Sequence, residues 1–260
     1  MSTPDVAVTR SRSWSFPRLT LPRSGMLGPA VLAVAVVAVW QLSSGLVFVI
    51  PSPADTIAEL GASLSDAAYR IDLARTAVAT LQAFAMGAGI GFVLGLVIGF
   101  SDWAKALFEP LLIAFNGIPK IVLYPVLLQL FSLSGGKVAM GVLFALFPVF
   151  VNVATGVREL PRVYWKLALS TQASRMQQLI HIVLPGIRKP LLTGVRLSVS
   201  LAMSGVVLSE FFATDRGLGR VVLQAFSHAE YATMVATLLL LVATSFIISV
   251  ALWNLEKKVR

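Results

Sequence analysis

Residues 76–100 read TAVATLQAFAMGAGIGFVLGLVIGF, an apolar run that contains no charged side chain. A helix needs about 20 apolar residues to cross a bilayer, because the hydrocarbon core is roughly 30 Å thick and a helix rises about 1.5 Å per residue. This run is therefore long enough to cross. Its glycines recur at every fourth position, which aligns them on one helix face where a second helix can approach closely. The glycines expected to support helix packing are Gly87, Gly91, Gly95 and Gly99.

The composition of the whole chain is that of a membrane protein. Of its 260 residues, 57% are hydrophobic and 13% are charged, whereas soluble domains carry about 25% charged residues. Cysteine is absent, which excludes disulfides, thiolate metal sites and cysteine nucleophiles. The two histidines, His181 and His228, do not have metal-ligand spacing. We therefore expect no metal and no cofactor bound by this chain.

The remaining apolar runs predict an all-α polytopic protein with about six transmembrane helices. Residues 1–25 carry four arginines among Ser, Thr and Pro and are predicted to form a basic tail, and residues 26–260 are predicted to form the membrane domain. Ser134 to Lys137 are expected to turn the chain between the third and fourth spans, and the polar stretch 157–192 separates the fourth span from the fifth. The predicted spans are 26–50, 76–100, 108–131, 137–156, 193–213 and 232–255.

The distribution of Lys and Arg predicts the orientation, because cytoplasmic loops carry an excess of these residues. With both termini inside, the inner side collects fourteen basic residues and the outer side five, among them Lys137. Lys120 and Arg196 then lie in or near the membrane. We therefore predict a multi-pass protein in the lipid bilayer with both termini in the cytoplasm. This topology explains the net charge of +9 without a nucleic-acid partner.

The inner loop between the fourth and fifth spans is longer than topology requires. Residues 164–186 read YWKLALSTQASRMQQLIHIVLPG, which fits a short helix, a turn and a second helix. Leu167, Thr171 and Ser174 fall on one face at helical spacings of three and four. Small or polar residues at 172–174 suit the bend. Such an element can dock into a cleft on a soluble partner.

This loop resembles the cytoplasmic signature of the binding-protein-dependent permeases of ATP-binding-cassette importers. That signature has a Glu-Ala-Ala opening, a Gly six residues after the Glu, and a Pro thirteen residues after the Gly. Counted back from Pro185, the glycine position is Gln172 and the glutamate position is Lys166. The two alanine positions are Leu167 and Ala168, so one alanine and the proline match.

Other pieces of the chain resemble the same family, in particular its group for nitrate, sulfonates, taurine and similar compounds. The Ala-Ser pair that commonly follows the signature glycine is kept as Ala173-Ser174. The further matching pieces are Pro51-Ser52-Pro53, Ile118-Pro119-Lys120, Gly156-Val157, the stretch 193–197, Ser209-Glu210 and Gly217-Leu218-Gly219. In this order and spacing they extend over nearly the whole chain from Met26 onward.

The resemblance implies a permease subunit in a bacterial inner membrane. It implies that the loop forms a coupling helix in a groove of a cytoplasmic ATPase, and that two ATPases, closing around ATP and Mg²⁺, drive two permeases in a homodimer. A periplasmic binding protein would deliver the solute, a small anion such as nitrate, a sulfonate or taurine. The residues implied for ATPase docking are Lys166, Leu167, Ala168, Thr171, Gln172, Ala173, Ser174 and Pro185. The chain is expected not to be an enzyme, since it has no Gly-x-x-x-x-Gly-Lys-Ser/Thr phosphate loop.

Two ionisable residues lie inside predicted spans, where a charge left in lipid costs at least about 2.5 kcal/mol. Lys120 in the third span and Glu210 in the fifth lie at depths similar enough for their long side chains to meet. They could form a buried ion pair that holds helices together, or line the solute path or a gate, and Glu210 could also lie near the outer interface. The residues considered for the path are Asn116, Lys120, Tyr124, Ser204 and Glu210.

Two other classes of membrane protein fit the sequence less well. An ion-gradient-driven secondary transporter would be expected to show internal repeats, broken spans in pairs and several buried carboxylates. The sequence offers one buried carboxylate, Glu210, and no convincing repeat. An integral membrane enzyme would need clustered His, Asp or Glu near one interface. The sequence therefore favours the permease, with the secondary transporter as the alternative.

Overall fold

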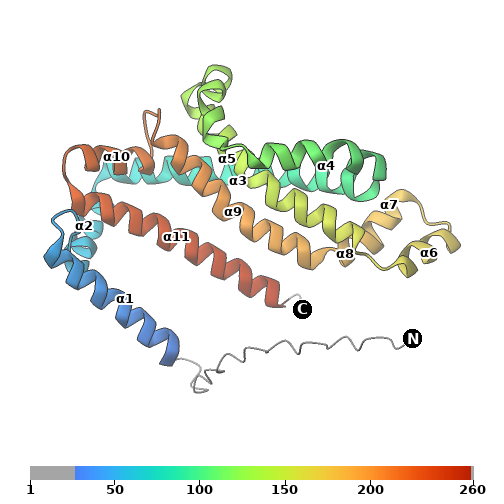
Figure 1. The fold of residues 1–260 in the computed structure, drawn as a ribbon, viewed down its shortest axis with the longest axis horizontal. Helices are drawn as coiled ribbons and strands as arrows, with labels where there is room; N and C mark the ends of the chain where they lie inside the picture. Colours follow the sequence, from blue (N-terminus) through green and yellow to red (C-terminus); the bar gives the residue numbers. More distant parts are fainter. Residues whose placement is uncertain (1–26, 259–260) are drawn as a thin grey trace, which may run out of the picture.

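The computed structural model describes residues 27–258, and every regular element in that range is a helix (Figure 1). The predicted basic tail, residues 1–25, lies outside the described residues. The elements are α1 (Leu27–Leu46), α2 (Pro53–Ser65), α3 (Ala67–Phe100), α4 (Asp102–Gly117), the 3₁₀ turn η1 (Lys120–Leu123), α5 (Tyr124–Arg158), α6 (Arg162–Ser170), α7 (Arg175–Gln178), the π-helical turn η2 (Leu179–Val183), α8 (Leu184–Gly186), α9 (Arg188–Glu210), α10 (Leu218–Ser227) and α11 (Tyr231–Lys258).

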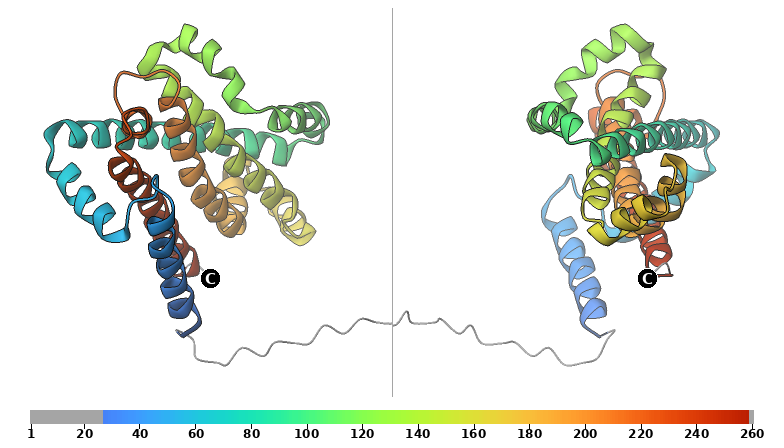
Figure 2. Two further views of the ribbon diagram at one scale, coloured as in Figure 1. Left: turned by 60° about the vertical axis from the view of Figure 1, so that its left-hand side comes forward. Right: turned by 90° about the vertical axis from the view of Figure 1, so that its right-hand side faces the viewer.

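The centre of the fold is formed by α3, α5 and α9, with α11 packed along α9. Helices α2 and α10 lie at one end of this bundle, and α6, α7 and α8 lie at the other (Figure 1). Helix α1 projects away from the bundle, as Figure 1 and the right-hand view of Figure 2 show. Its apolar side chains are exposed along its length, so in a membrane they would face lipid or another chain.

The contact between α3 and α5 is close because α3 presents glycines to it. An added Cβ at Gly91 would lie 2.5 Å from the carbonyl oxygen of Leu146, and one at Gly95 would lie 2.7 Å from the Cβ of Val153. Real Cβ atoms do not approach so closely, so only a hydrogen fits at these positions. The residues that lie against α5 in this way are Gly87, Gly91, Gly95 and Gly99.

The third predicted span, residues 108–131, holds Pro119, Lys120 and Pro125 in its interior, and the helix is broken there between α4 and α5. Helix α4 ends at Gly117, and Ile118 is extended, with φ −76° and ψ 132°. Pro119 explains this end, because the ring of a proline disfavours the α conformation in the residue before it. The turn η1 then precedes α5. The third predicted span is therefore interrupted in the structure.

A second break lies inside α5. Ser132 has φ 61° and ψ −177°, so two helical stretches meet there at a kink. The chain around this kink projects from the bundle, in bright green at the top of Figure 1. The predicted turn at Ser134 to Lys137 is helical, and the change of direction comes before it, at Ser132. A positive φ is unfavourable for a residue with a Cβ, so this kink is a site of backbone strain.

Within the described residues, five helical stretches are long and apolar enough to cross a membrane. Four of them overlap the first, second, fifth and sixth predicted spans, and a single kinked stretch replaces the third and fourth. The fold class is confirmed as an all-helical membrane protein, with five candidate spans in place of about six. The candidates are Gly28–Leu46, Ala67–Phe100, Lys120–Arg158, Arg188–Glu210 and Tyr231–Lys257.

The α3–α5 contact predicts how two glycines on one helix will differ. Gly91→Ala should lower the midpoint of thermal unfolding in detergent, since overpacking a close contact costs about 1–3 kcal/mol. Gly89→Ala is the matched control, because nothing lies within 4 Å of a Cβ added there. It should leave the midpoint unchanged or raise it. Equal midpoints for the two variants would contradict the assigned contact.

Candidate functional site

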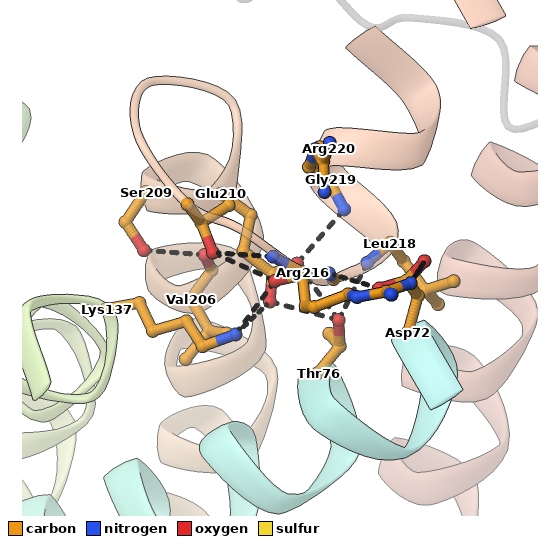
Figure 3. A network of polar contacts seen from close by, with 12 residues as sticks. Asp72, Thr76, Lys137, Val206, Ser209, Glu210, Arg216, Leu218, Gly219 and Arg220 are labelled. Atoms are coloured by element: carbon orange, nitrogen blue, oxygen red, sulfur yellow. Dashed lines mark hydrogen bonds and ion pairs between the residues drawn. The ribbon is translucent and has the colours of Figure 1, made fainter. Parts of the chain in front are cut away.

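A buried ion pair joins α9 to α5 near the α10 end of the bundle (Figure 3). The Nζ atom of Lys137 lies 3.0 Å from Oε1 of Glu210. Glu210 is 1% exposed and Lys137 is 5% exposed. Both residues belong to candidate membrane spans. Because removing one partner of a buried ion pair costs about 3–5 kcal/mol, the pair constrains how these two helices pack.

The carboxylate of Glu210 also accepts hydrogen bonds from outside α5. The hydroxyl of Thr76 on α3 lies 3.1 and 2.9 Å from its two oxygens. The backbone N–H of Gly219 on α10 donates to Oε2 at 3.0 Å. Glu210 thus binds three other elements at once, and its charge is satisfied by an ammonium, a hydroxyl and a backbone amide.

The first amides of α10 are capped by side chains from α3 and α9. The first amides of a helix lack acceptors within the helix. The N–H of Gly217 donates to Oδ1 of Asp72 at 2.9 Å, and the N–H of Leu218 donates to Oγ1 of Thr76 at 2.8 Å. Gly219 donates to Glu210. Three successive amides therefore find acceptors on two membrane helices.

Gly217 allows the carboxylate of Glu210 to come this close. Its φ of 136° is a conformation that residues with side chains rarely adopt, and an added Cβ would collide with the Glu210 carboxylate. Gly217 therefore meets both a steric and a conformational requirement. The Gly-Leu-Gly piece seen in the sequence belongs to this helix start.

The loop 211–217 between α9 and α10 is tied down at further points. Lys137 donates a second hydrogen bond to the carbonyl oxygen of Arg216 at 3.1 Å. The guanidinium of Arg216 lies 3.8 Å from Oδ2 of Asp72. The hydroxyl of Tyr124, at the start of α5, donates to the carbonyl oxygen of Ala213 at 2.7 Å. The loop is thus held by α3 and α5 as well as by its own flanking helices.

The structure brings together two of the five residues considered for the solute path. Tyr124 holds the loop 211–217 and Glu210 holds the start of α10 that follows it, and both residues are buried. The buried partner of Glu210 is Lys137. The Nζ atom of Lys120 lies 5.0 Å from the ring centroid of Phe147, within the range of a cation–π contact.

The other two path candidates lie elsewhere. Asn116 belongs to α4. Ser204 is exposed on α9, where its hydroxyl donates to the carbonyl oxygen of Ser200 and lines a groove of about 510 Å³ between α9 and α11. Among the described residues, no group of three or more His, Asp or Glu side chains is arranged to hold a metal ion.

Sequence reasoning missed Lys137 because Ser134 to Lys137 suggests a turn. Within α5, however, Lys137 stands one helical turn before Gly141, where an added Cβ would meet Ala83 and Val206. This helical spacing puts Lys137 on the buried face of α5. The sequence alone does not show that Gly141 faces α3 and α9, so it could not identify Lys137 as the partner of Glu210.

The second candidate region is the segment α6 to α8 at the opposite end of the bundle (Figure 1). One face of α6 rests on the bundle, since Ala168 is 2% exposed and the ring of Trp165 meets Phe100 of α3 edge to face, with 5.9 Å between ring centroids. Buried Val183 and Ile187 belong to the same core cluster as α5. The segment is thus a packed part of the fold.

Helix α6 ends in a Schellman motif centred on Gln172. The N–H of Ala173 donates to the carbonyl of Ala168 at 2.9 Å, and the N–H of Gln172 donates to that of Leu169 at 3.1 Å. Gln172 has φ 51°, the left-handed conformation that usually requires glycine at this position. The position where the family signature has glycine is therefore left-handed in this chain although it holds glutamine.

Ser174 is the N-cap of α7 and forms a capping box with Gln177. The Gln177 amide N–H donates to the Ser174 hydroxyl at 3.3 Å, and the Ser174 N–H donates to the Gln177 side chain at 2.8 Å. This arrangement satisfies two amides that the helix cannot. Thr171 is exposed at the bend, and Pro185 lies in the first turn of α8. These local bonds fix the shape of the segment.

The buried pair predicts non-additive stability changes. Lys137→Met should lower the unfolding midpoint strongly because it leaves the Glu210 charge buried with fewer donors. The double variant Lys137→Met/Glu210→Gln should unfold at a higher temperature than Lys137→Met alone, since it removes that charge. Thermal unfolding in detergent would measure both. A double variant that loses the sum of the two single effects would contradict the assigned pair.

The left-handed residue predicts a difference between two substitutions at one position. Gln172→Val should open the turn, because a β-branched residue at positive φ is strongly disfavoured. Gln172→Gly should preserve it. Hydrogen exchange of the Ala173 amide reports the turn directly, and it should be faster in the valine variant than in the glycine variant. Equal exchange rates would contradict the assigned geometry.

Comparisons with known proteins bear on both regions. The sequence model of the family described as "Binding-protein-dependent transport system inner membrane component" matches residues 87–260. The taurine transport system permease protein TauC of Escherichia coli is 25% identical over 261 residues, which is 96% of this chain and 93% of that protein. The formylaminopyrimidine transport permease protein ThiX of Halalkalibacterium halodurans is 27% identical over 197 residues, which is 74% of this chain and 78% of that protein.

A solved structure shares the fold. A chain of the MetNI methionine ABC transporter, solved in inward-facing conformations, superposes with a TM-score of 0.61 at 19% identity. The match covers 75% of this chain and 99% of that chain. Together with the family match, which extends over more than half of the sequence, this confirms the resemblance seen in the sequence. The chain belongs to the family of inner membrane components of binding-protein-dependent transport systems.

Proposed function

We propose that this chain is the membrane-spanning permease subunit of an ATP-driven importer and that α6 docks into a cytoplasmic ATPase. The observation that carries the proposal is an apolar face of α6 that the bundle leaves uncovered. Leu167 is 55% exposed and Val163, one turn earlier, is 64% exposed. Because contiguous exposed apolar side chains mark interaction sites, this face suits a groove on a soluble partner.

The charges around α6 support a partner in water. Arg162, Lys166 and Arg175 are exposed on the same segment, and Arg188 and Lys189 follow it. So many charges do not suit the hydrocarbon core of a bilayer. The excess of basic residues also supports a cytoplasmic location for this end, with both termini on that side.

The anchoring of α6 supports transmission of movement. Its inner face packs on α3 through Trp165 and Phe100. The segment is continuous with α5 on one side and with α9 on the other. A partner that moves α6 would therefore move two of the three central helices as well.

The assembly proposed for this chain contains two permeases and two ATPases. A second copy of this chain would complete the path as a homodimer, ATP and Mg²⁺ would bind the ATPases, and a periplasmic binding protein would deliver the solute. The residues proposed for the path, Asn116, Lys120, Tyr124, Ser204 and Glu210, belong to α4, η1, α5 and α9. In this structure Tyr124 and Glu210 are buried and Ser204 lines the groove between α9 and α11, so the path requires a rearrangement of these helices.

The solute proposed is a small oxyanion such as nitrate or a sulfonate, including the zwitterionic sulfonate taurine. Support comes from the relatives, because TauC is named for taurine, and the nitrate import permease protein NrtB of Synechococcus elongatus is 26% identical over 159 residues. That second match covers 60% of this chain and 55% of NrtB.

The docking proposal is tested by co-purification of the tagged chain with the ATPase encoded beside it. Leu167→Asp places a charge in the apolar face and should abolish ATPase recovery and ATP-driven uptake into vesicles. Leu167→Met keeps the face apolar and is the matched control, with wild-type recovery expected. Ala168 is less suitable for this test because it lies on the buried face of α6, so a substitution there would also disturb the packing of α6 on the bundle.

Two results would overturn the proposal. Undiminished ATPase recovery with Leu167→Asp would exclude this face as the docking site. Failure of any ATPase to bind, combined with solute uptake by the purified chain alone in an ion gradient, would establish a secondary transporter instead.

A further inference from the structure

The loop 211–217 is held by bonds that come from both sides of the kink in α5. Tyr124, before Ser132, holds the carbonyl of Ala213. Lys137, after Ser132, holds the carbonyl of Arg216. Two stretches of one helix thus hold two points of one loop, and the strained residue lies between them. If the stretches change their relative angle at Ser132, both bonds cannot keep their present lengths.

Two further hydrogen bonds, to side chains of α3 and α9, also require the loop to stay in its present place. Asp72 accepts from Gly217, and Glu210 accepts from Gly219. If the loop moved away, these carboxylates would lose backbone donors, and Lys137 would lose a carbonyl acceptor. Partly satisfied charges are costly at low dielectric, so a position that breaks some of these bonds while still excluding water is less stable than the closed position. It is also less stable than an open position in which water solvates the carboxylates and the ammonium.

We infer that the loop 211–217 is a latch with two positions, and that Lys137 and Asp72 are the positioning residues that hold it closed at the α10 end of the bundle. A change of angle at Ser132 releases the latch, and α10 then leaves its place against α3, α9 and α11. The inference rests on the proposed function, since it assigns the release to the ATP-driven cycle.

A substitution at Gly217 distinguishes opening of the latch from an effect of removing a charged group. Gly217→Ala keeps every charged group, yet its Cβ would collide with the Glu210 carboxylate in the closed position. It should therefore open the latch as Lys137→Met does, by a different cause. Gly89→Ala is the control, because it adds the same methyl group in open space on α3.

The test uses the absence of cysteine from the chain. Val222 is 5% exposed on the inner side of α10 and takes no part in the bonds of the loop, so Val222→Cys reports whether α10 has left its place. The complete transporter, carrying this cysteine and assembled with its ATPases in nanodiscs, would be treated with a water-soluble maleimide. Labelling rates would be compared without nucleotide and after trapping with ATP, Mg²⁺ and vanadate.

The expected result has two parts. Without nucleotide, labelling should be slow in the parent and in Gly89→Ala, and about tenfold faster or more in Lys137→Met and Gly217→Ala, since each loses charge-assisted bonds. Trapping should raise the rate in the parent to that of the two variants. Asp72→Asn, which keeps an acceptor for Gly217, should give an intermediate rate.

Several outcomes would overturn the latch. If the parent protein is labelled at the same rate in both nucleotide states, the loop 211–217 does not move during the cycle and is a fixed contact. Slow labelling in Gly217→Ala and Lys137→Met shows that the bonds do not hold α10. Failure of the proposed function is recognised separately, because a chain that binds no ATPase still reports through the labelling of its variants. Equal slow labelling of parent and variants would then also refute the latch.

Discussion

A buried ion pair inside a helical membrane bundle restricts how the helices that carry it can pack against each other. Glu210 and Lys137 lie on α9 and α5, and each must keep its partners because lipid offers none. Thr76 extends the constraint to α3, and the amide of Gly219 extends it to α10. The relative placement of the three central helices and of the loop 211–217 at one end of the bundle therefore depends on one carboxylate. This placement also requires the glycine face of α3, which lets α5 approach α3 closely.

The part of the fold that the sequence predicts well depends on local pattern. Apolar runs locate the helices because run length and bilayer thickness must agree, and the spacing of Gly87 to Gly99 predicts a shared face because helical period is fixed. Pro119 signals the end of α4 through its own ring. Ser132 carries no comparable signal, because serine is compatible with helix and turn alike. Because Ser132 gives no such signal, the sequence predicted two spans where the structure has one kinked helical stretch, Lys120–Arg158.

The candidate site shows the same division. Glu210 stands out in the sequence as a carboxylate in an apolar run, but its partner depends on which face of α5 meets α9, which is a tertiary property. Lys137 was not predicted to be buried because it follows a Ser-Gly-Gly pattern that usually indicates a turn. Gln172 is the reverse case, since counting back from Pro185 marks its position as one for glycine. The positive φ there is retained although glutamine favours it less, so the fold of the segment overrides the preference of the residue.

Helix α1 lies apart from the bundle, and this has a consequence for synthesis. It is the first apolar run to leave the ribosome among the described residues, and it does not depend on α3, α5 or α9 to satisfy its backbone. A helix satisfies its own hydrogen bonds in lipid, so α1 can enter the bilayer alone and retain the growing chain there. The close contacts between α3 and α5 can form only after α5 has been made, and the contacts with α9 only after the chain has reached residue 210. Insertion and assembly are thus separate events in this protein, with a lipid-solvated helix as the first and a tightly packed bundle as the second.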